Sequence, residues 1–134
     1  QMRLGIEPQA AAQAALAVRG GQAEVLQPIR AALARMQAAG AGADDPLASD
    51  IAFHVAILQA SGNRFLLQLR ELVDTALRIS IRMTNAQKGV ALASVDYHAR
   101  VLHAIEVGDA TAAAAAMRAL LGEVLDLIEA ARDR

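Results

Sequence analysis

The strongest candidates for a functional role in this sequence are an acidic residue and a histidine, Asp50 and His54. They are four apart, and on a helix this spacing places a carboxylate and an imidazole one turn apart on the same side. The same side carries the apolar residues Leu47, Ile51, Ile57 and Leu58. A buried carboxylate and imidazole cost free energy unless something satisfies them. We therefore expect these two side chains to meet each other, a metal ion or a polar ligand inside the protein.

A second histidine, His98, shares its helix face with Val101, Leu102 and Ile105, so it should also point inward. His103 lies about 140° further around the same helix and is expected at the surface. An inward histidine is more often a hydrogen-bonded core residue than a ligand. Together, however, Asp50, His54 and His98 offer three donors that suit zinc, nickel or manganese. The alternative is that no metal binds and Asp50 pairs with one of the two histidines.

Three arginines could supply the other half of a binding site: Arg3, Arg78 and Arg82. A guanidinium grips a carboxylate in a planar fork, so these residues are our candidates for contact with an acidic effector. The alternative is that their stems lie on the bundle surface with the charged ends in solvent. Arg3 could also pair with Glu7, four residues along.

The composition favours an all-α protein and excludes several function classes. The chain has 134 residues, 55% of them hydrophobic but only 2% aromatic, and alanine and leucine, both strong helix formers, dominate. A net charge of -1 and the lack of a basic stripe argue against direct binding to DNA. The absence of cysteine excludes disulfides and thiolate metal sites. We find no membrane-spanning run and no secretion signal, so we expect a cytoplasmic protein.

The apolar spacing predicts six helices that form one domain over residues 1–134. Their expected limits are about Arg3–Val18, Gln22–Ala39, Pro46–Ala60, Arg64–Ala86, Ala91–Val107 and a last helix capped by Asp109. Short connections favour antiparallel neighbours, so the expected fold is an up-and-down bundle. No nucleophile elbow, Gly-rich phosphate loop or paired carboxylates are present, which makes an enzyme a poor interpretation.

The order and spacing of several segments resemble a known family. They are Arg3-Leu4-Gly5-Ile6-Glu7-Pro8, Asp50-Ile51-Ala52-Phe53-His54, Ala60-Ser61-Gly62-Asn63, Tyr97-His98 and Met117-Arg118-Ala119. In this order they resemble the FCD domain, the C-terminal effector-binding and dimerisation domain of the FadR-like branch of the GntR family of bacterial transcription regulators. The resemblance covers essentially the whole chain.

The resemblance implies an antiparallel bundle of six or seven helices around a ligand cavity. It also implies a divalent metal (Zn, Ni or Mn) held by Asp50, His54 and His98, with a fourth ligand at a position where this chain has Leu120. Leucine cannot coordinate, so the site would have three protein ligands. We expect Phe53, Phe65, Met83 and Tyr97 to line the cavity.

The predicted function is therefore that of a ligand sensor. A small organic acid would bind the metal or the histidines, a homodimer would change its arrangement, and DNA would be bound only through an N-terminal winged helix-turn-helix domain that this chain lacks. A structural or oligomerisation bundle without a ligand is the main alternative. A metal-dependent enzyme is the third possibility, but His103, the spare histidine, lies on the wrong face to act as its base.

Overall fold

The computed structural model describes residues 2–85 and 95–132, and their side chains except those of residues 2, 80–85, 128, 131 and 132. Over this part of the chain it contains seven α-helices, one short 3-10 helix and no strand. The elements are α1 (Met2–Arg19), η1 (Ala23–Val25), α2 (Leu26–Gly40), α3 (Pro46–Ala60), α4 (Arg64–Leu67), α5 (Arg70–Asn85), α6 (Val95–Glu106) and α7 (Ala110–Arg132). The all-α bundle predicted from composition and periodicity is confirmed.

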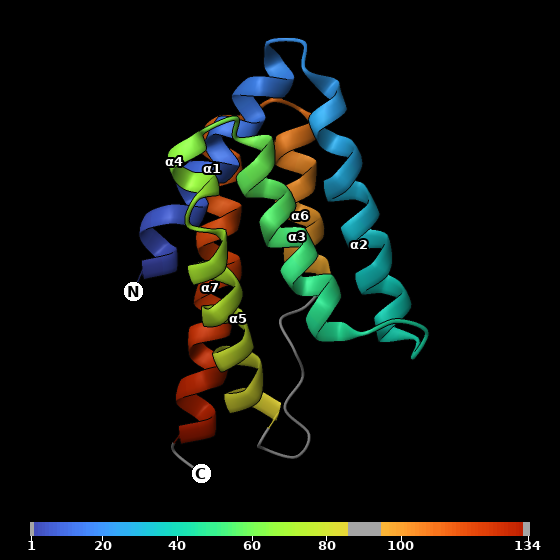
Figure 1. Ribbon diagram of the computed structural model, residues 1–134, viewed down its shortest axis with the longest axis vertical. Helices are drawn as coiled ribbons and strands as arrows, with labels where there is room; N and C mark the ends of the chain where they lie inside the picture. Colours follow the sequence, from blue (N-terminus) through green and yellow to red (C-terminus); the bar gives the residue numbers. More distant parts are fainter. Residues whose placement is uncertain (1, 86–94, 133–134) are drawn as a thin grey trace.

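The long helices alternate in direction along the bundle (Figure 1). Two pairs of consecutive helices pack against each other, α2 with α3 and α6 with α7. The first helix packs against the last, and α1 also contacts α3 and α6. Helix α1 is thus a neighbour of both α3, which carries Asp50 and His54, and α6, which carries His98.

The central position of α1 follows from its small residues. Its buried face is made largely of alanines that are fully inaccessible to solvent: Ala10, Ala11, Ala14 and Ala15. Such side chains bury apolar surface while letting neighbouring helices approach closely. The thin apolar side that the sequence predicts for this helix is therefore its packing face.

Capping residues set the limits of α3 and α7 where the sequence places them. The Asp45 side chain accepts hydrogen bonds from the backbone N–H groups of Leu47 and Ala48, and Pro46 occupies the first turn, where it loses no helical bond. Asp109 likewise accepts from Ala112 at the start of α7 (3.0 Å). The predicted break after α1 is confirmed too, because Gly21 has a φ of 97°, which glycine adopts easily.

The single long helix predicted from Arg64 to Ala86 is wrong, because residues 68 and 69 form a turn between α4 and α5. There the N–H of Leu69 bonds to the carbonyl of Leu66, three residues back, instead of four back as in an α-helix. The turn reorients the chain so that α5 packs on α3 and α7. No glycine or proline marks this place, so the apolar spacing continues through it.

One further limit differs from the prediction, and one lies outside the described residues. The second helix does not begin at Gln22, because Ala23–Val25 form a 3-10 turn before α2 starts at Leu26. The predicted start of the fifth helix at Ala91 lies outside the described residues, and α6 is described from Val95. No helix in the described part of the chain is long and apolar enough to cross a membrane.

Candidate metal centre

Helix α3 supplies two of the polar residues, Asp50 and His54, and both are buried as predicted. Nε2 of His54 lies 3.1 Å from Oδ1 of Asp50. Their spacing of four residues produces this contact, because each side chain stands over the same face one turn from the other. The exposed capping turn at Asp45 and Pro46 begins α3 five and four residues before Asp50. It therefore fixes on which side of the helix Asp50 and His54 lie.

Helix α6 brings His98 to the same carboxylate. Its Nε2 is 3.1 Å from Oδ1 of Asp50, and the ring is completely buried. Phe53 packs edge-on against both imidazoles, with ring centroids 4.9 Å from that of His98 and 5.7 Å from that of His54. The aromatic ring restricts how far either imidazole can turn.

Helix α1 adds Glu7 and Arg3 to this cluster. From the sequence, neither residue was expected to contact Asp50, His54 or His98 directly. One oxygen of Glu7 contacts Nδ1 of His54, and the other lies 2.5 Å from Nε of Arg3. Both side chains are almost completely buried. From the sequence, Glu7 was expected as a partner for Arg3 and was not assigned to a site. The signal that could have found it is its spacing of three, four and seven residues from the buried Ala10, Ala11 and Ala14, which places it on the same helix face.

Five residues from three helices thus form one buried network: Arg3, Glu7, His54, Asp50 and His98. In the described part of the chain, every buried side-chain nitrogen or oxygen has a hydrogen-bond partner. The network therefore holds together through its own charges and hydrogen bonds, as a buried polar group requires.

The two carboxylates stay ionised despite their burial. Burial raises the pKa of Glu7, but attraction and hydrogen bonding from His54 and Arg3 outweigh it and lower the pKa to about 2. Burial also raises the pKa of Asp50, and the adjacent His54 and His98 more than reverse this, so its pKa falls well below the usual range. Both groups are therefore acceptors at neutral pH.

His54 lies between these two anions and responds in the opposite direction. Burial lowers its pKa, but attraction to Glu7 and hydrogen bonds to Asp50 and Glu7 raise it to about 9, against a smaller opposing effect of Arg3. The two anions therefore favour the imidazolium form of the ring, which can donate from Nδ1 to Glu7 and from Nε2 to Asp50.

A comparison with protein families identifies the family of this chain. The family model of the FCD domain matches residues 1–123. The chain belongs to the FCD domain family. FCD domains are the C-terminal effector-binding domains of GntR-family regulators, so this is a ligand-sensing regulatory domain and its family is not one of enzymes. A comparison with curated proteins gave no match.

The donor atoms of this FCD domain fit a divalent metal. One ligand atom from each of Asp50, His54 and His98 lies within 4.8 Å of the other two. Atoms that bind zinc at about 2.0–2.1 Å in a tetrahedron lie about 3.3 Å apart. The two contacts of 3.1 Å to Asp50 are close to this value. A buried group that could hold a metal is present, as in many FCD domains.

The other residues singled out from the sequence lie in varied places. Leu120, where the family resemblance implies a fourth ligand, is fully buried in α7, and His103 is exposed as predicted. Arg78 is exposed and its Nε lies 2.5 Å from Asp74 on its own helix. The side chains of Arg82 and Met83 lie outside the described part of the structure.

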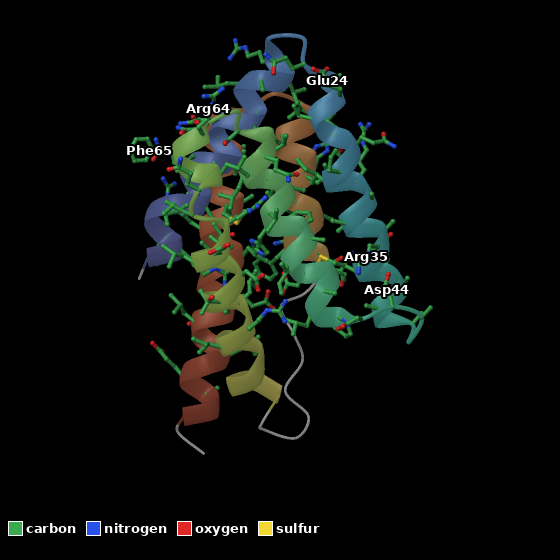
Figure 2. All side chains as sticks on the ribbon, in the orientation of Figure 1. Glu24, Arg35, Asp44, Arg64 and Phe65 are labelled. Atoms are coloured by element: carbon green, nitrogen blue, oxygen red, sulfur yellow. The ribbon has the colours of Figure 1, made fainter. Side chains whose placement is uncertain are left out.

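The predicted cavity lining is wrong for Phe65. Its side chain is 81% exposed and points away from the bundle (Figure 2). In the short helix α4, Leu66 is the residue that is buried, and Phe65 beside it lies on the exposed side. Phe53 is fully buried beside the histidines, and Tyr97 is half-buried with the Arg100 guanidinium 5.0 Å from its ring centre.

Proposed function

We propose that this domain senses a small organic acid through a divalent metal, zinc, nickel or manganese, held by Asp50, His54 and His98. The observation that carries the proposal is the convergence of one carboxylate and two imidazoles from α3 and α6 in the core. The three groups satisfy one another by hydrogen bonds, and one carboxylate with two imidazoles is also a donor set that suits a divalent metal.

The metal would supply a positive charge and open coordination positions to which a carboxylate can bind. With Leu120 in place of a fourth donor, three protein ligands leave at least one such position for water or the effector. Asp50 and the two imidazoles would hold the ion, and Phe53 would limit rotation of the rings. The protons on the Nε2 atoms must leave when a metal binds, so the binding releases protons.

Of the three arginines predicted to contact the effector, Arg3 is the one that this geometry favours. Its guanidinium nitrogen Nη2 lies 3.4 Å from Nδ1 of His54, inside the bundle. Arg3 already binds Glu7 inside the bundle, and Arg78 binds Asp74 at the surface. Effector contacts by Arg3, Arg78 and Arg82 all stay predictions.

We also propose that the domain acts as a homodimer and controls an N-terminal winged helix-turn-helix domain that binds DNA. Helix α5 exposes Leu72 and Ile79, which are seven residues apart and so lie on one face. An effector can change DNA binding only through its different affinities for two arrangements of the dimer. Sedimentation of the wild type and of Leu72→Glu tests the dimer, which this substitution should weaken.

A structural bundle without a ligand is the second candidate, and one observation favours it. The polar network leaves no buried side-chain nitrogen or oxygen without a partner in the described residues. A protein whose network is complete needs neither metal nor effector to fold.

A thermal-shift screen separates the two functions. Purified, chelator-treated protein is heated with carboxylates and sugar acids, with and without zinc, beside the Asp50→Ala variant. A ligand at 100 times its dissociation constant stabilises the fold by about 2.7 kcal/mol. We expect zinc to raise the melting temperature of the wild type but not that of Asp50→Ala. Adding an acid together with zinc should raise the melting temperature of the wild type further. No shift with any compound would favour the structural bundle.

A further inference from the structure

The carboxylate of Glu7 is shared between two cationic side chains. Oε1 contacts Nδ1 of His54 on α3, and Oε2 lies 2.5 Å from Nε of Arg3, one turn earlier on α1. All three side chains are buried. Both oxygens are therefore in use, and the carboxylate has little freedom to move.

The contact with Glu7 determines which nitrogen of His54 can bind a metal. An ionised carboxylate only accepts hydrogen bonds, so Nδ1 of His54 must carry the proton that it donates to Glu7. Nε2 then faces Asp50 Oδ1 at 3.1 Å and is the nitrogen that can coordinate. Metal-binding histidines usually have such a partner on the other nitrogen, which fixes the ring and makes the ligand more basic.

Arg3 acts on His54 indirectly. Its Nη2 lies 3.4 Å from Nδ1 of His54, but both groups are donors when Nδ1 binds Glu7, so this approach is not a hydrogen bond. The bond that Arg3 does make is to Glu7. The guanidinium balances the charge of this carboxylate and keeps Oε2 turned away from the metal ligands.

We propose that Glu7 is a positioning residue of the metal centre, which holds His54 with Nδ1 protonated and Nε2 directed at Asp50 and His98, and that Arg3 keeps Glu7 in this role. The proposal rests on the proposed metal function for its effect on affinity. Helix α1, which supplies no metal ligand among the described residues, then sets how tightly a three-ligand site binds. A well-oriented His54 offsets part of what is lost with Leu120.

The test compares Glu7→Gln with Asp74→Asn. Asp74 and Arg78 form a pair with the same spacing and the same 2.5 Å contact at the surface, so Asp74→Asn is a matched control. In glutamine an NH2 group, which only donates, takes the place of one carboxylate oxygen, so the side chain cannot replace both the oxygen that faces His54 and the oxygen that faces Arg3. We expect Glu7→Gln to weaken zinc binding 10–100-fold in a chelator competition, the usual effect of losing such a partner. Asp74→Asn should bind zinc like the wild type.

A second measurement reads the ring of His54 without any metal. In nitrogen-15 spectra of the metal-free protein, Nδ1 of His54 should carry a hydrogen-bonded, slowly exchanging proton. The double variant Arg3→Met/Glu7→Leu removes both charges together, so it should fold, and this proton should disappear while zinc binding weakens at least as much as in Glu7→Gln. Wild-type zinc affinity in both variants, or a Nδ1 proton that persists in the double variant, would overturn the proposal. A third outcome separates the two proposals. If the wild type binds no zinc, but the Nδ1 proton is present in the wild type and absent from the double variant, the positioning of His54 stands and the proposed metal function fails.

Discussion

Two ion pairs of this protein share one local geometry but lie in different surroundings. Arg3 and Glu7 on α1, and Asp74 and Arg78 on α5, are each four residues apart and join Nε to a carboxylate oxygen at 2.5 Å. In the α1 pair the side chain of Arg3 is 2% exposed and that of Glu7 is 1% exposed. In the α5 pair the corresponding values are 47% for Arg78 and 37% for Asp74. The two pairs therefore have the same spacing along the helix, but the α1 pair belongs to the core network and the α5 pair is in contact with solvent.

The difference shows that burial, and not spacing, decides what such a pair does. An exposed pair exchanges water for a partner and contributes about 0–1 kcal/mol. A buried pair has already lost its water, so each member depends on the other and on every further partner. Glu7 has such a further partner in His54, which links α1 to the candidate metal centre.

Removing one carboxylate from each pair should give the largest difference in stability between the two pairs. Glu7→Ala leaves the Arg3 guanidinium and the His54 ring buried without their acceptor, so we expect a loss of about 3–5 kcal/mol in the free energy of unfolding. Asp74→Ala should change it by about 0.5 kcal/mol or less. Urea unfolding of the metal-free variants measures both. Equal losses would show that the buried network does not stabilise the fold.

The pH dependence of stability gives the next largest effect. The pKa of His54 rises from its ordinary value of 6.5 to about 9 in the folded protein. Its stabilising contribution is thus fully present below pH 6.5 and is lost as the pH rises through about 9. A difference of this size corresponds to about 3 kcal/mol.

Urea unfolding of the metal-free protein at pH 6, 7.5 and 9 measures this loss. Glu7→Gln should make the decline clearly smaller, because attraction to Glu7 is the main cause that raises the pKa of His54. Asp74→Asn is the control and should decline like the wild type. An unchanged decline in Glu7→Gln would contradict the assignment to His54.

Removing both members of the buried pair should cost less than removing one. Replacing a buried ion pair by apolar residues of similar volume is often close to neutral. We expect Arg3→Met/Glu7→Leu to unfold within about 2 kcal/mol of the wild type, because His54 still loses an acceptor. The comparison with the single variants in urea gives the coupling energy. A double variant as unstable as the sum of both single variants would show that the pair is not coupled.

The smallest effect is the response to salt. The Debye length falls to about 3 Å at 1 M salt, which screens an exposed pair and hardly affects a buried one. The effect of Asp74→Asn, a few tenths of a kcal/mol, should vanish in 1 M sodium chloride, whereas that of Glu7→Gln should persist. The reverse result would mean that the α1 pair is open to solvent.

The fold could be predicted from the sequence wherever the signal was local. Apolar spacing, together with Asp45, Pro46, Gly21 and Asp109, gave the limits of α3, the end of α1 and the start of α7. The turn at Gln68 and Leu69 could not be predicted in this way. Its cause is the packing of α5 on distant helices, and the residues themselves are ordinary helix formers.

The candidate site could be predicted in part for the same reason. Asp50, His54 and His98 lie on apolar helix faces, so their burial followed from periodicity. Their convergence on one carboxylate oxygen depends on how α3 and α6 pack, which the sequence does not show. Glu7 was missed because a carboxylate is seldom fully buried, and the packing of α1 against α3, α6 and α7 that buries this helix face depends on distant parts of the chain.

Anomalous scattering from zinc-soaked crystals of this domain tests whether Asp50, His54 and His98 form a metal centre. We expect an anomalous peak within about 2.0–2.2 Å of Nε2 of His54, Nε2 of His98 and an oxygen of Asp50, and its absence in Asp50→Ala. Fully occupied zinc elsewhere in the crystal, with no peak between these three side chains, would contradict the claim.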